Sequence, residues 1–171
     1  MNINIFFAAI IFSLVLILFL FKPLNIKQQD FGEIPVFELT NFKLMELNKK
    51  GLTTVMHGDE GTRYTNRYVV NNIDYTDNTK KYLANMKAVK GIYKEDIVNL
   101  EKDIIYKRED GVSFTTQKAV YDKKTSIVTS PTKYVGYIEK NKITGSYIEY
   151  NNMLDTIKSR KVTVNYKLKE R

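Results

Sequence analysis

The sequence predicts an all-β protein in which antiparallel hairpins follow one another, preceded by one N-terminal transmembrane helix. Three observations lead to this fold class. Turn-forming residues recur about every 8–12 residues, with β-branched and aromatic residues between them. Three segments repeat one hairpin pattern of strand, tyrosine, polar turn and strand. The chain begins with a long apolar run.

Residues 1–24 are predicted to form the membrane anchor. The stretch "IFFAAIIFSLVLILFLF" (5–21) has 17 residues, Ser13 is its only polar residue, and the first charged side chain is Lys22. Extended slightly at both ends, it would form a helix of roughly 30 Å, the thickness of a bilayer's hydrocarbon core. A cleaved signal peptide and a buried core helix are the alternatives. The run is longer than a signal core, and no small-residue cleavage site follows it.

Residues 25–38 are predicted to be a linker, and residues 39–171 are predicted to be the folded domain. Pro23 precedes this region and Pro35 lies within it, and proline lacks the N–H that a sheet ladder requires. The alternative is that the end of the linker already forms an edge strand.

Eight turn signals divide the domain into short strands. They are "NKKG" (48–51), "HGDEG" (57–61), "DNTK" (77–80), "REDG" (108–111), "YDKK" (121–124), "SPTK" (130–133), "EKNK" (139–142) and "YNNM" (150–153). Asp and Asn favour turns because their side chains bond to the turn backbone and tolerate left-handed conformations. The repeated hairpins are "IDYTDNTKKYLA" (73–84), "AVYDKKTSIVTS" (119–130) and "IEYNNMLDTIKS" (148–159).

Alternation of apolar and polar residues indicates the strands and their apolar face. In residues 111–122 the phase of this alternation changes, which predicts a β-bulge around Thr116–Lys118. Residues 91–106 have partly helical spacing, but we expect a strand because their end leads directly into a turn. Alternation is clearest in the last strand, whose apolar face would carry Val162, Val164, Tyr166 and Leu168.

Taken in order, the chain has an N-terminal anchor, a short linker, "FELTNFKLMELNKKG", "IDYTDNTKKYL", "VNLEKDIIYKREDGVSFTTQKAVYDKKTSIVTS", "ITGSYIEYNN" and "KVTVNYKL". This order resembles the LptC family of lipopolysaccharide-transport proteins over nearly the whole chain. LptA and the N-terminal part of LptD share the hairpin arrangement, and the anchor and short length select LptC. One departure is Gly145, which is followed by Ser146 and Tyr147 where many members carry a second glycine.

The resemblance implies an OstA/LptA-like antiparallel β-jellyroll that is open along one side and lies in the periplasm. It also implies a single-pass inner-membrane anchor with a cytoplasmic N-terminus. Charge alone weakly favours the opposite orientation, because Lys22 and Lys27 follow the apolar run. The implied partners are lipopolysaccharide, an inner-membrane ABC transporter of LptB, LptF and LptG, and an LptA-like bridge protein that receives the lipid.

An apolar interior would shelter the lipid's acyl chains, since each CH₂ exposed to water costs ~0.8 kcal/mol. The candidate lipid-binding residues are Phe114, Tyr121, Ile138, Ile148, Tyr150, Val162, Val164 and Tyr166. A filled core requires the same alternation, so the alternative function is a membrane-anchored scaffold of another envelope assembly, with no ligand.

Open edges of the sheet could pair with partner chains. We expect the first strand, near Phe37 to Leu47, to face the transporter, and the last strand to join the LptA-like protein. The alternative is that lysines flanking the last strand block such pairing. The candidate edge residues are Phe42, Leu44, Val162, Val164, Tyr166 and Leu168.

The composition gives no indication of an enzyme. The sequence has one histidine, His57, and no cysteine, so the usual transition-metal ligand sets are incomplete and no metal or other cofactor is expected. The 27 Lys and Arg against 19 Asp and Glu give a net charge of +8, which suits anionic partners such as lipid headgroups. Nucleic acid is disfavoured as a partner because of the membrane anchor.

Overall fold

The structure, a computed structural model, describes residue 16, residues 34–49 and residues 51–166. The predicted anchor, apart from Leu16, and residues 25–33 of the predicted linker lie outside the described residues. The linker's last two residues, Phe37 and Glu38, already belong to an edge strand, β1 (Phe37–Asn48). Within the described residues, no helix is long and apolar enough to cross a membrane. All the strands belong to one compact unit, Phe31–Arg171.

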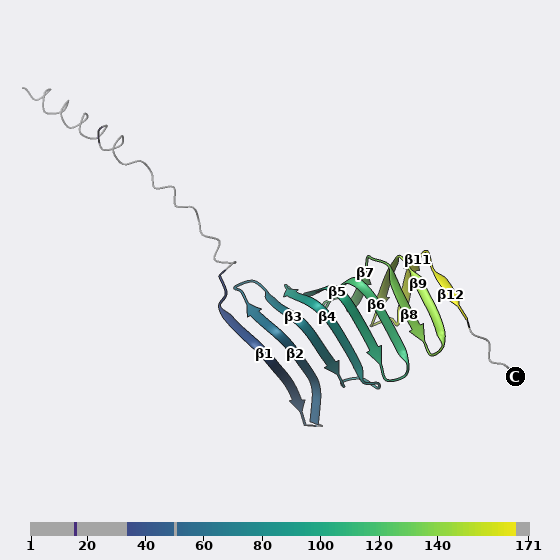
Figure 1. The fold of residues 1–171 in the computed structure, drawn as a ribbon, viewed down its shortest axis with the longest axis horizontal. Helices are drawn as coiled ribbons and strands as arrows, with labels where there is room; N and C mark the ends of the chain where they lie inside the picture. Colours follow the sequence, from purple (N-terminus) through teal and green to yellow (C-terminus); the bar gives the residue numbers. More distant parts are fainter. Residues whose placement is uncertain (1–15, 17–33, 50, 167–171) are drawn as a thin grey trace, which may run out of the picture. The chain divides into compact units, whose positions relative to one another are not determined.

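The described domain consists of strands that form a single antiparallel sheet, and this confirms the all-β prediction (Figure 1). The strands are β1 (Phe37–Asn48), β2 (Gly51–Arg63), β3 (Tyr68–Asp77), β4 (Ala84–Lys94), β5 (Ile97–Arg108), β6 (Val112–Asp122), β7 (Ile127–Ser130), β8 (Tyr134–Ile138), β9 (Asn141–Gly145), β10 (Tyr147–Asn151), β11 (Thr156–Arg160) and β12 (Thr163–Asn165). The sheet is open, because β1 pairs only with β2, β11 only with β10, and β12 only with β9 among the described strands.

The sheet divides into two arms at β6. The first half of β6 pairs with β8, and its last three residues pair with β7. One arm therefore runs β8–β9–β12 and the other runs β7–β10–β11.

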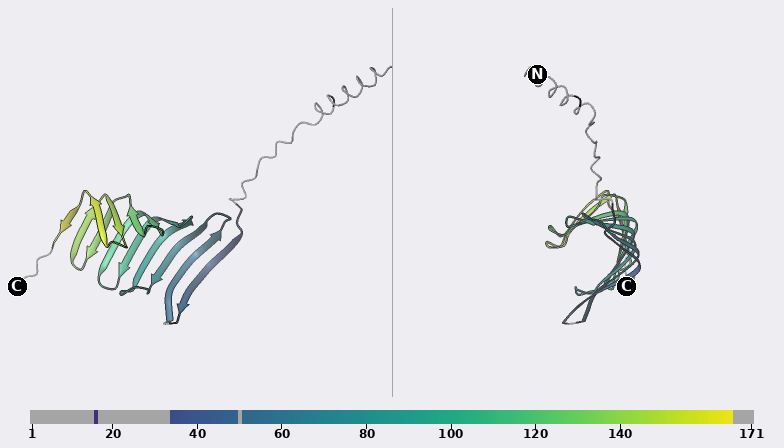
Figure 2. Two further views of the ribbon diagram at one scale, coloured as in Figure 1. Left: turned by 180° about the vertical axis from the view of Figure 1, so that it is seen from behind. Right: turned by 90° about the vertical axis from the view of Figure 1, so that its left-hand side faces the viewer.

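The long strands bend near their middles, so the sheet curls into a trough that is open on one side (Figure 2). Residues with positive φ lie at these bends: Asn41 in β1 (φ 48°), Asn72 in β3 (52°), and Lys102 and Asp103 in β5 (63° and 49°). Asparagine and aspartate tolerate this left-handed conformation better than most residues. The Asn72 side chain also donates a 2.7 Å hydrogen bond to Asp59 Oδ2 on β2, which ties neighbouring strands together at the bend.

The predicted turn at residues 57–61 is wrong, because this segment lies inside β2. Its glycines make room for an aromatic ring on β1. A Cβ atom built on Gly58 would lie 2.7 Å from the Phe42 ring, and one built on Gly61 would lie 2.8 Å from it. The glycine spacing that suggested a turn therefore reflects side-chain packing across two strands.

The other seven turn signals and the three repeated hairpins are confirmed, at β3–β4, β6–β7 and β10–β11. Residues 91–106 are extended as predicted, but a turn at Glu95–Asp96 separates β4 from β5 there. The phase change in β6 is also confirmed, since Thr116 and Ala119, three residues apart, are both buried. The additional residue at this bulge belongs to β5, opposite Gln117, rather than to β6.

The prediction of a long last strand is wrong. Only Thr163–Asn165 form β12, and Val162 and Tyr166 flank it outside the strand. Leu168 lies outside the described residues. Three residues of β12 pair with Lys142, Ile143 and Thr144 of the five-residue β9, its only partner among the described strands.

A buried hydroxyl cluster holds the two arms together where they diverge. Thr116 Oγ1 lies 2.7 Å from Ser130 Oγ and 2.8 Å from Thr132 Oγ1, and it donates to Lys133 O at 3.1 Å. Farther along, Tyr134 on β8 and Ser159 on β11 share a 2.7 Å hydrogen bond between their hydroxyls. Buried hydroxyls are stable only when they are paired, so these contacts fix how the arms separate.

Replacing Gly58 with alanine is expected to lower the free energy of unfolding by about 1–3 kcal/mol, because the new methyl group would collide with the Phe42 ring and Val70. Urea unfolding followed by circular dichroism measures this. Gly136→Ala on β8 is the matched control, because its Cβ would meet nothing closer than 3.7 Å. Equal stability of the two variants would contradict the packing of Phe42 over β2.

Thr116→Val is expected to lower the free energy of unfolding by about 1–3 kcal/mol, since it leaves the Ser130 hydroxyl, in a residue that is 1% exposed, without this partner. The matched control is Thr115→Val, whose hydroxyl makes only an exposed 3.3 Å bond. In the double variant Thr116→Val/Ser130→Ala, the loss should be smaller than the sum of the single losses. Additive losses would show that the two hydroxyls are not coupled.

Candidate lipid-binding groove

Two rows of mostly apolar side chains run across the inner face of the trough. Residues directly opposite each other in antiparallel strands lie on the same face of the sheet, so the register defines each row. The first row, here called the β12 row, consists of Leu44, Met56, Tyr75, Met86, Tyr106, Phe114, Gly136, Ile143 and Val164. It passes through nine strands, and only Gly136 lacks a side chain.

The second row lies on the other wall and is called the β11 row. Its members are Phe37, Arg63, Tyr68, Tyr93, Val98, Tyr121, Val128, Tyr150 and Ile157. Tyrosine is its commonest residue. A tyrosine ring offers an apolar surface with a polar tip, which suits a boundary between acyl chains and water.

The two rows face each other across the trough. Burial raises the pKa of Tyr75 in the β12 row, and interaction with Tyr121 in the β11 row raises it further. Burial likewise raises the pKa of Tyr106 and of Tyr150, and Arg108 on the opposite wall acts against the increase at Tyr150. A direct contact also joins the two sides, since Lys80 in the β3–β4 turn lies 2.7 Å from Asn152 in the β10–β11 turn.

The interior is not filled by tightly packed side chains. The buried hydrophobic residues among those described are Ile73, Ala88, Leu100, Ile104, Ala119 and Tyr134. All of these except Tyr134 form one cluster along the bottom of the trough, and Met56, Tyr75 and Met86 pack against this cluster while remaining partly exposed. Among the described residues, the buried hydrophobic cluster thus lies at the bend, where the two walls meet. A filled sandwich of this size would bury many large side chains completely, whereas the largest such residue described is Ser130.

The candidate lipid-binding residues fall into three groups. Phe114 and Val164 belong to the β12 row, and Tyr121 and Tyr150 belong to the β11 row. Ile148 is on the same face as Tyr150, one row nearer the bottom. The remaining three are exposed: Ile138 lies at the end of β8, and Val162 and Tyr166 flank β12.

Sequence reasoning missed much of both rows, above all Met56, Tyr75, Met86 and Tyr106 in the middle of the β12 row. A usable signal was present in the turns. Pairing each strand with the next across its turn aligns Tyr75 with Met86 and Tyr106 with Phe114. The unpredicted bends and bulges shift the register within several strands, which hides the rows from simple alternation.

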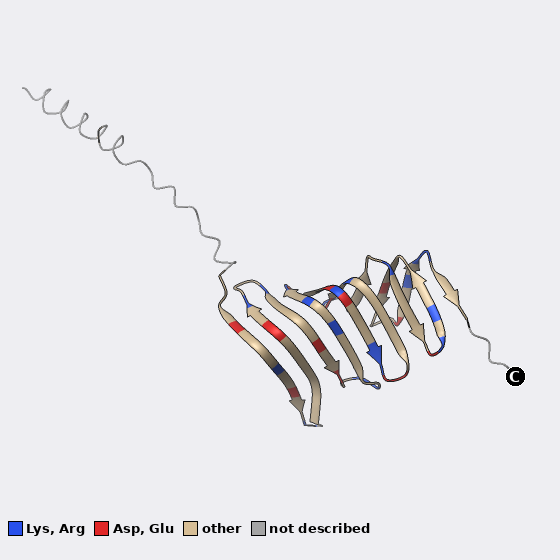
Figure 3. Ribbon diagram, viewed as in Figure 1, with Lys and Arg blue, Asp and Glu red and all other residues tan. Residues whose placement is uncertain are grey.

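The two walls end in rims formed by hairpin turns, and cations lie over aromatic rings at both rims. Arg67 lies 4.1 Å from the Tyr64 ring centroid and Lys123 lies 5.0 Å from that of Tyr93 on the β11 side. On the β12 side, Lys81 lies 4.8 Å from the Tyr82 ring. Acidic and basic residues alternate along the ribbon rather than gathering in one block (Figure 3). The rims therefore present mixed charge beside an apolar interior.

The described candidate edge residues lie on or beside the edge strands β1 and β12, and Leu168 lies outside the described residues. Leu44 is exposed on β1, whereas the Phe42 ring is half-buried and faces the interior glycines of β2. Val164 on β12 is exposed, as are Val162 and Tyr166 beside it. Both apolar rows begin on the edge strand β1, and each ends on the edge strand of one arm, β12 or β11.

His57 lies on β2, opposite Lys43 and Asp74 in register. Its neighbouring acidic residues lie along an extended strand rather than in a turn. No group of three or more His, Cys, Asp or Glu that could hold a metal ion occurs within the part of the chain that the structure describes.

Comparison with known proteins agrees with this architecture. Residues 6–167 match the family model for LptC-related lipopolysaccharide-assembly proteins. No curated protein gives a significant match. The family is one of transport and binding proteins rather than enzymes, and its match covers nearly the whole chain. The curled, open sheet and its two apolar rows are features that such a role requires. The chain therefore belongs to the LptC family and takes part in lipopolysaccharide transport.

Proposed function

We propose that the trough binds the acyl chains of lipopolysaccharide and passes the lipid from an inner-membrane ABC transporter of LptB, LptF and LptG to an LptA-like bridge protein. The observation that carries this proposal is the incomplete filling of the interior. Apolar side chains line both walls, yet those in the middle of the rows remain partly exposed. Burying apolar surface stabilises a complex by about 25 cal/mol per Å², so acyl chains would bind there.

The unpaired edges support a position between two partners. An exposed edge strand can accept a further strand from another chain. Pairing at β1 would connect the trough to the transporter, and pairing at β12 would connect it to the bridge protein. Because the β12 row ends at Leu44 on β1 and at Val164 on β12, a partner with a similar row would extend the apolar path.

A structural scaffold without a ligand would need a filled interior. The buried cluster is small and lies at the bend, so the structure favours a groove that accepts chains from outside.

Val164→Asp is expected to weaken lipopolysaccharide binding by about tenfold or more, because it places a charge beside acyl chains that exclude water. The residue is 55% exposed, so the fold should tolerate the change. Asn165→Asp is the matched control, since it introduces the same charge on the opposite face of β12. Photo-crosslinking of lipopolysaccharide to the full chain measures binding.

Equal binding by both variants would contradict the groove. So would the absence of any binding by the unmodified, folded protein. In either case the scaffold would become the better explanation.

We further propose that residues 1–24 form a single-pass anchor in the inner membrane, that the linker predicted over residues 25–38 ends where β1 begins at Phe37, and that the folded domain, predicted over residues 39–171, lies in the periplasm. The apolar run from 5 to 21 supports the anchor. The family's periplasmic role supports the orientation, against the weak charge preference.

Reporter fusions at residue 171 test this orientation. Alkaline phosphatase, which is active only in the periplasm, should be active there, and a green fluorescent protein that requires the cytoplasm should be dark. The opposite pair of results would place the domain in the cytoplasm.

A further inference from the structure

The two rims of the trough are joined by a side-chain hydrogen bond that crosses its open side. Lys80 lies in the β3–β4 turn on the β12-row rim, and Asn152 lies in the β10–β11 turn on the opposite rim. The Lys80 ammonium donates a 2.7 Å hydrogen bond to Asn152 Oδ1. The two residues are 72 positions apart in the sequence, so this contact depends entirely on how the sheet curls.

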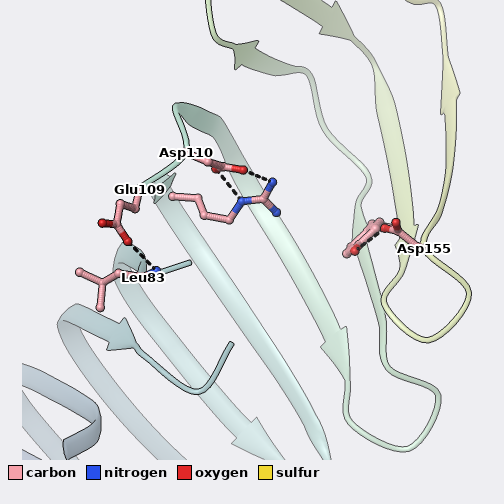
Figure 4. Close-up of polar contacts among 6 residues, drawn as sticks. Leu83, Glu109, Asp110 and Asp155 are labelled. Atoms are coloured by element: carbon pink, nitrogen blue, oxygen red, sulfur yellow. Dashed lines mark hydrogen bonds and ion pairs between the residues drawn. The ribbon is translucent and has the colours of Figure 1, made fainter. Parts of the chain in front are cut away.

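Each of the two turns is held firmly in place. On the Lys80 side, Glu109 N donates to Leu83 O at 2.9 Å, and Leu83 N donates to the Glu109 carboxylate at 3.3 Å (Figure 4). On the other side, Asn152 N donates to Ser126 O at 3.0 Å. Tyr150 also donates a 2.9 Å bond to Asp155 within its own hairpin. The bridge therefore joins two ordered turns through one flexible lysine side chain.

This bridge lies where a lipid headgroup would have to be. If acyl chains occupy the two rows, as the proposed function requires, the bulky headgroup can leave the trough only through its open side. A headgroup moving along the trough would meet the Lys80–Asn152 contact and would have to break it.

The chemistry of the bridge favours such an exchange. Lys80 makes no salt bridge with any described residue, and its partner is a neutral amide. The Lys80–Asn152 bond has a charged donor but a neutral acceptor. A phosphate would add a full negative charge on the acceptor and so a Coulombic attraction that the amide oxygen lacks, and lysine binds phosphate well as a point charge. We propose that Lys80 is a phosphate-binding residue at the mouth of the groove, which exchanges Asn152 for the phosphorylated headgroup of a lipid held inside.

Neighbouring charges are consistent with this assignment to Lys80. The Arg108 guanidinium is already bound to both oxygens of Asp110, at 2.8 and 2.7 Å. The Asp77 carboxylate accepts two bonds from Thr79 in the same turn. Lys81 lies against the Tyr82 ring and adds positive charge beside Lys80. Lys80 is thus the residue of this turn that already reaches across the opening.

Lys80→Gln is expected to weaken binding of phosphorylated lipid A by about three- to tenfold, since an exposed charge pair contributes modestly. Binding of lipid A from which the phosphates have been removed should not change. The measurement is photo-crosslinking of each lipid to the full chain, held in a neutral amphipathic polymer, with p-benzoylphenylalanine in place of Tyr121. Lys118→Gln, which removes an exposed charge from the other face of β6, is the matched control and should bind both lipids normally.

Asn152→Ala provides the decisive comparison. It breaks the bridge but leaves Lys80 free to bind phosphate, so binding of phosphorylated lipid A should be equal or up to a few-fold tighter. If the bridge were only structural, Lys80→Gln and Asn152→Ala would weaken binding alike, and the assignment would be wrong.

Three further outcomes are informative. Inorganic phosphate in excess should compete poorly, because it lacks acyl chains; effective competition would assign the site to free phosphate instead. If the unmodified protein binds both lipids equally and Lys80→Gln changes the binding of neither, the proposed lipid-binding groove is still supported. The proposal that Lys80 binds the phosphorylated headgroup would then be wrong. If the unmodified protein binds neither lipid, the proposed function fails and this inference fails with it.

Discussion

Backbone register is the constraint on which the rest of this structure depends. In an antiparallel ladder, opposed residues share a face, and a slip of one residue would send the whole set to the other face. Here the pairing holds from Leu44 on β1 to Val164 on β12. The apolar path is therefore a property of many hydrogen-bonded pairs together. Positive-φ residues in β1, β3 and β5, and register shifts between β1 and β2, β4 and β5, and β5 and β6, absorb bends without breaking this order.

The curl explains how an open sheet can be stable with little buried core. Strand pairing gives the backbone N–H and C=O groups their hydrogen-bond partners, and the small cluster around Ile73, Leu100 and Ile104 stabilises the bend. The side chains nearer the rims contribute less burial, because no second layer covers them. The same lack of a covering layer leaves the walls accessible, so the feature that limits the core also provides a surface for a ligand.

The division of the sheet at β6 gives the two walls different ends. The β8–β9–β12 arm continues one wall and the β7–β10–β11 arm continues the other, and paired hydroxyls at Thr116 and Tyr134 set their separation. On the opposite side of the trough, the contact between Lys80 and Asn152 is polar and exposed. The walls are thus joined by buried contacts at the bottom and by a breakable one at the mouth, which suits a groove that loads from its open side.

The sequence by itself determined the all-β fold class, most turns and the family, because turn chemistry and alternation are local properties. It also placed Phe114, Tyr121, Tyr150 and Val164 on the apolar face. Tertiary structure decided the rest. The glycines at 57–61 looked like a turn because their packing partner, Phe42, is on another strand, and the last strand is short because only Thr163–Asn165 pair with β9. The rows and the contact between Lys80 and Asn152 depend on the combined effect of bends and bulges in many strands. That combined effect is a long-range property, so a local sequence pattern does not predict it.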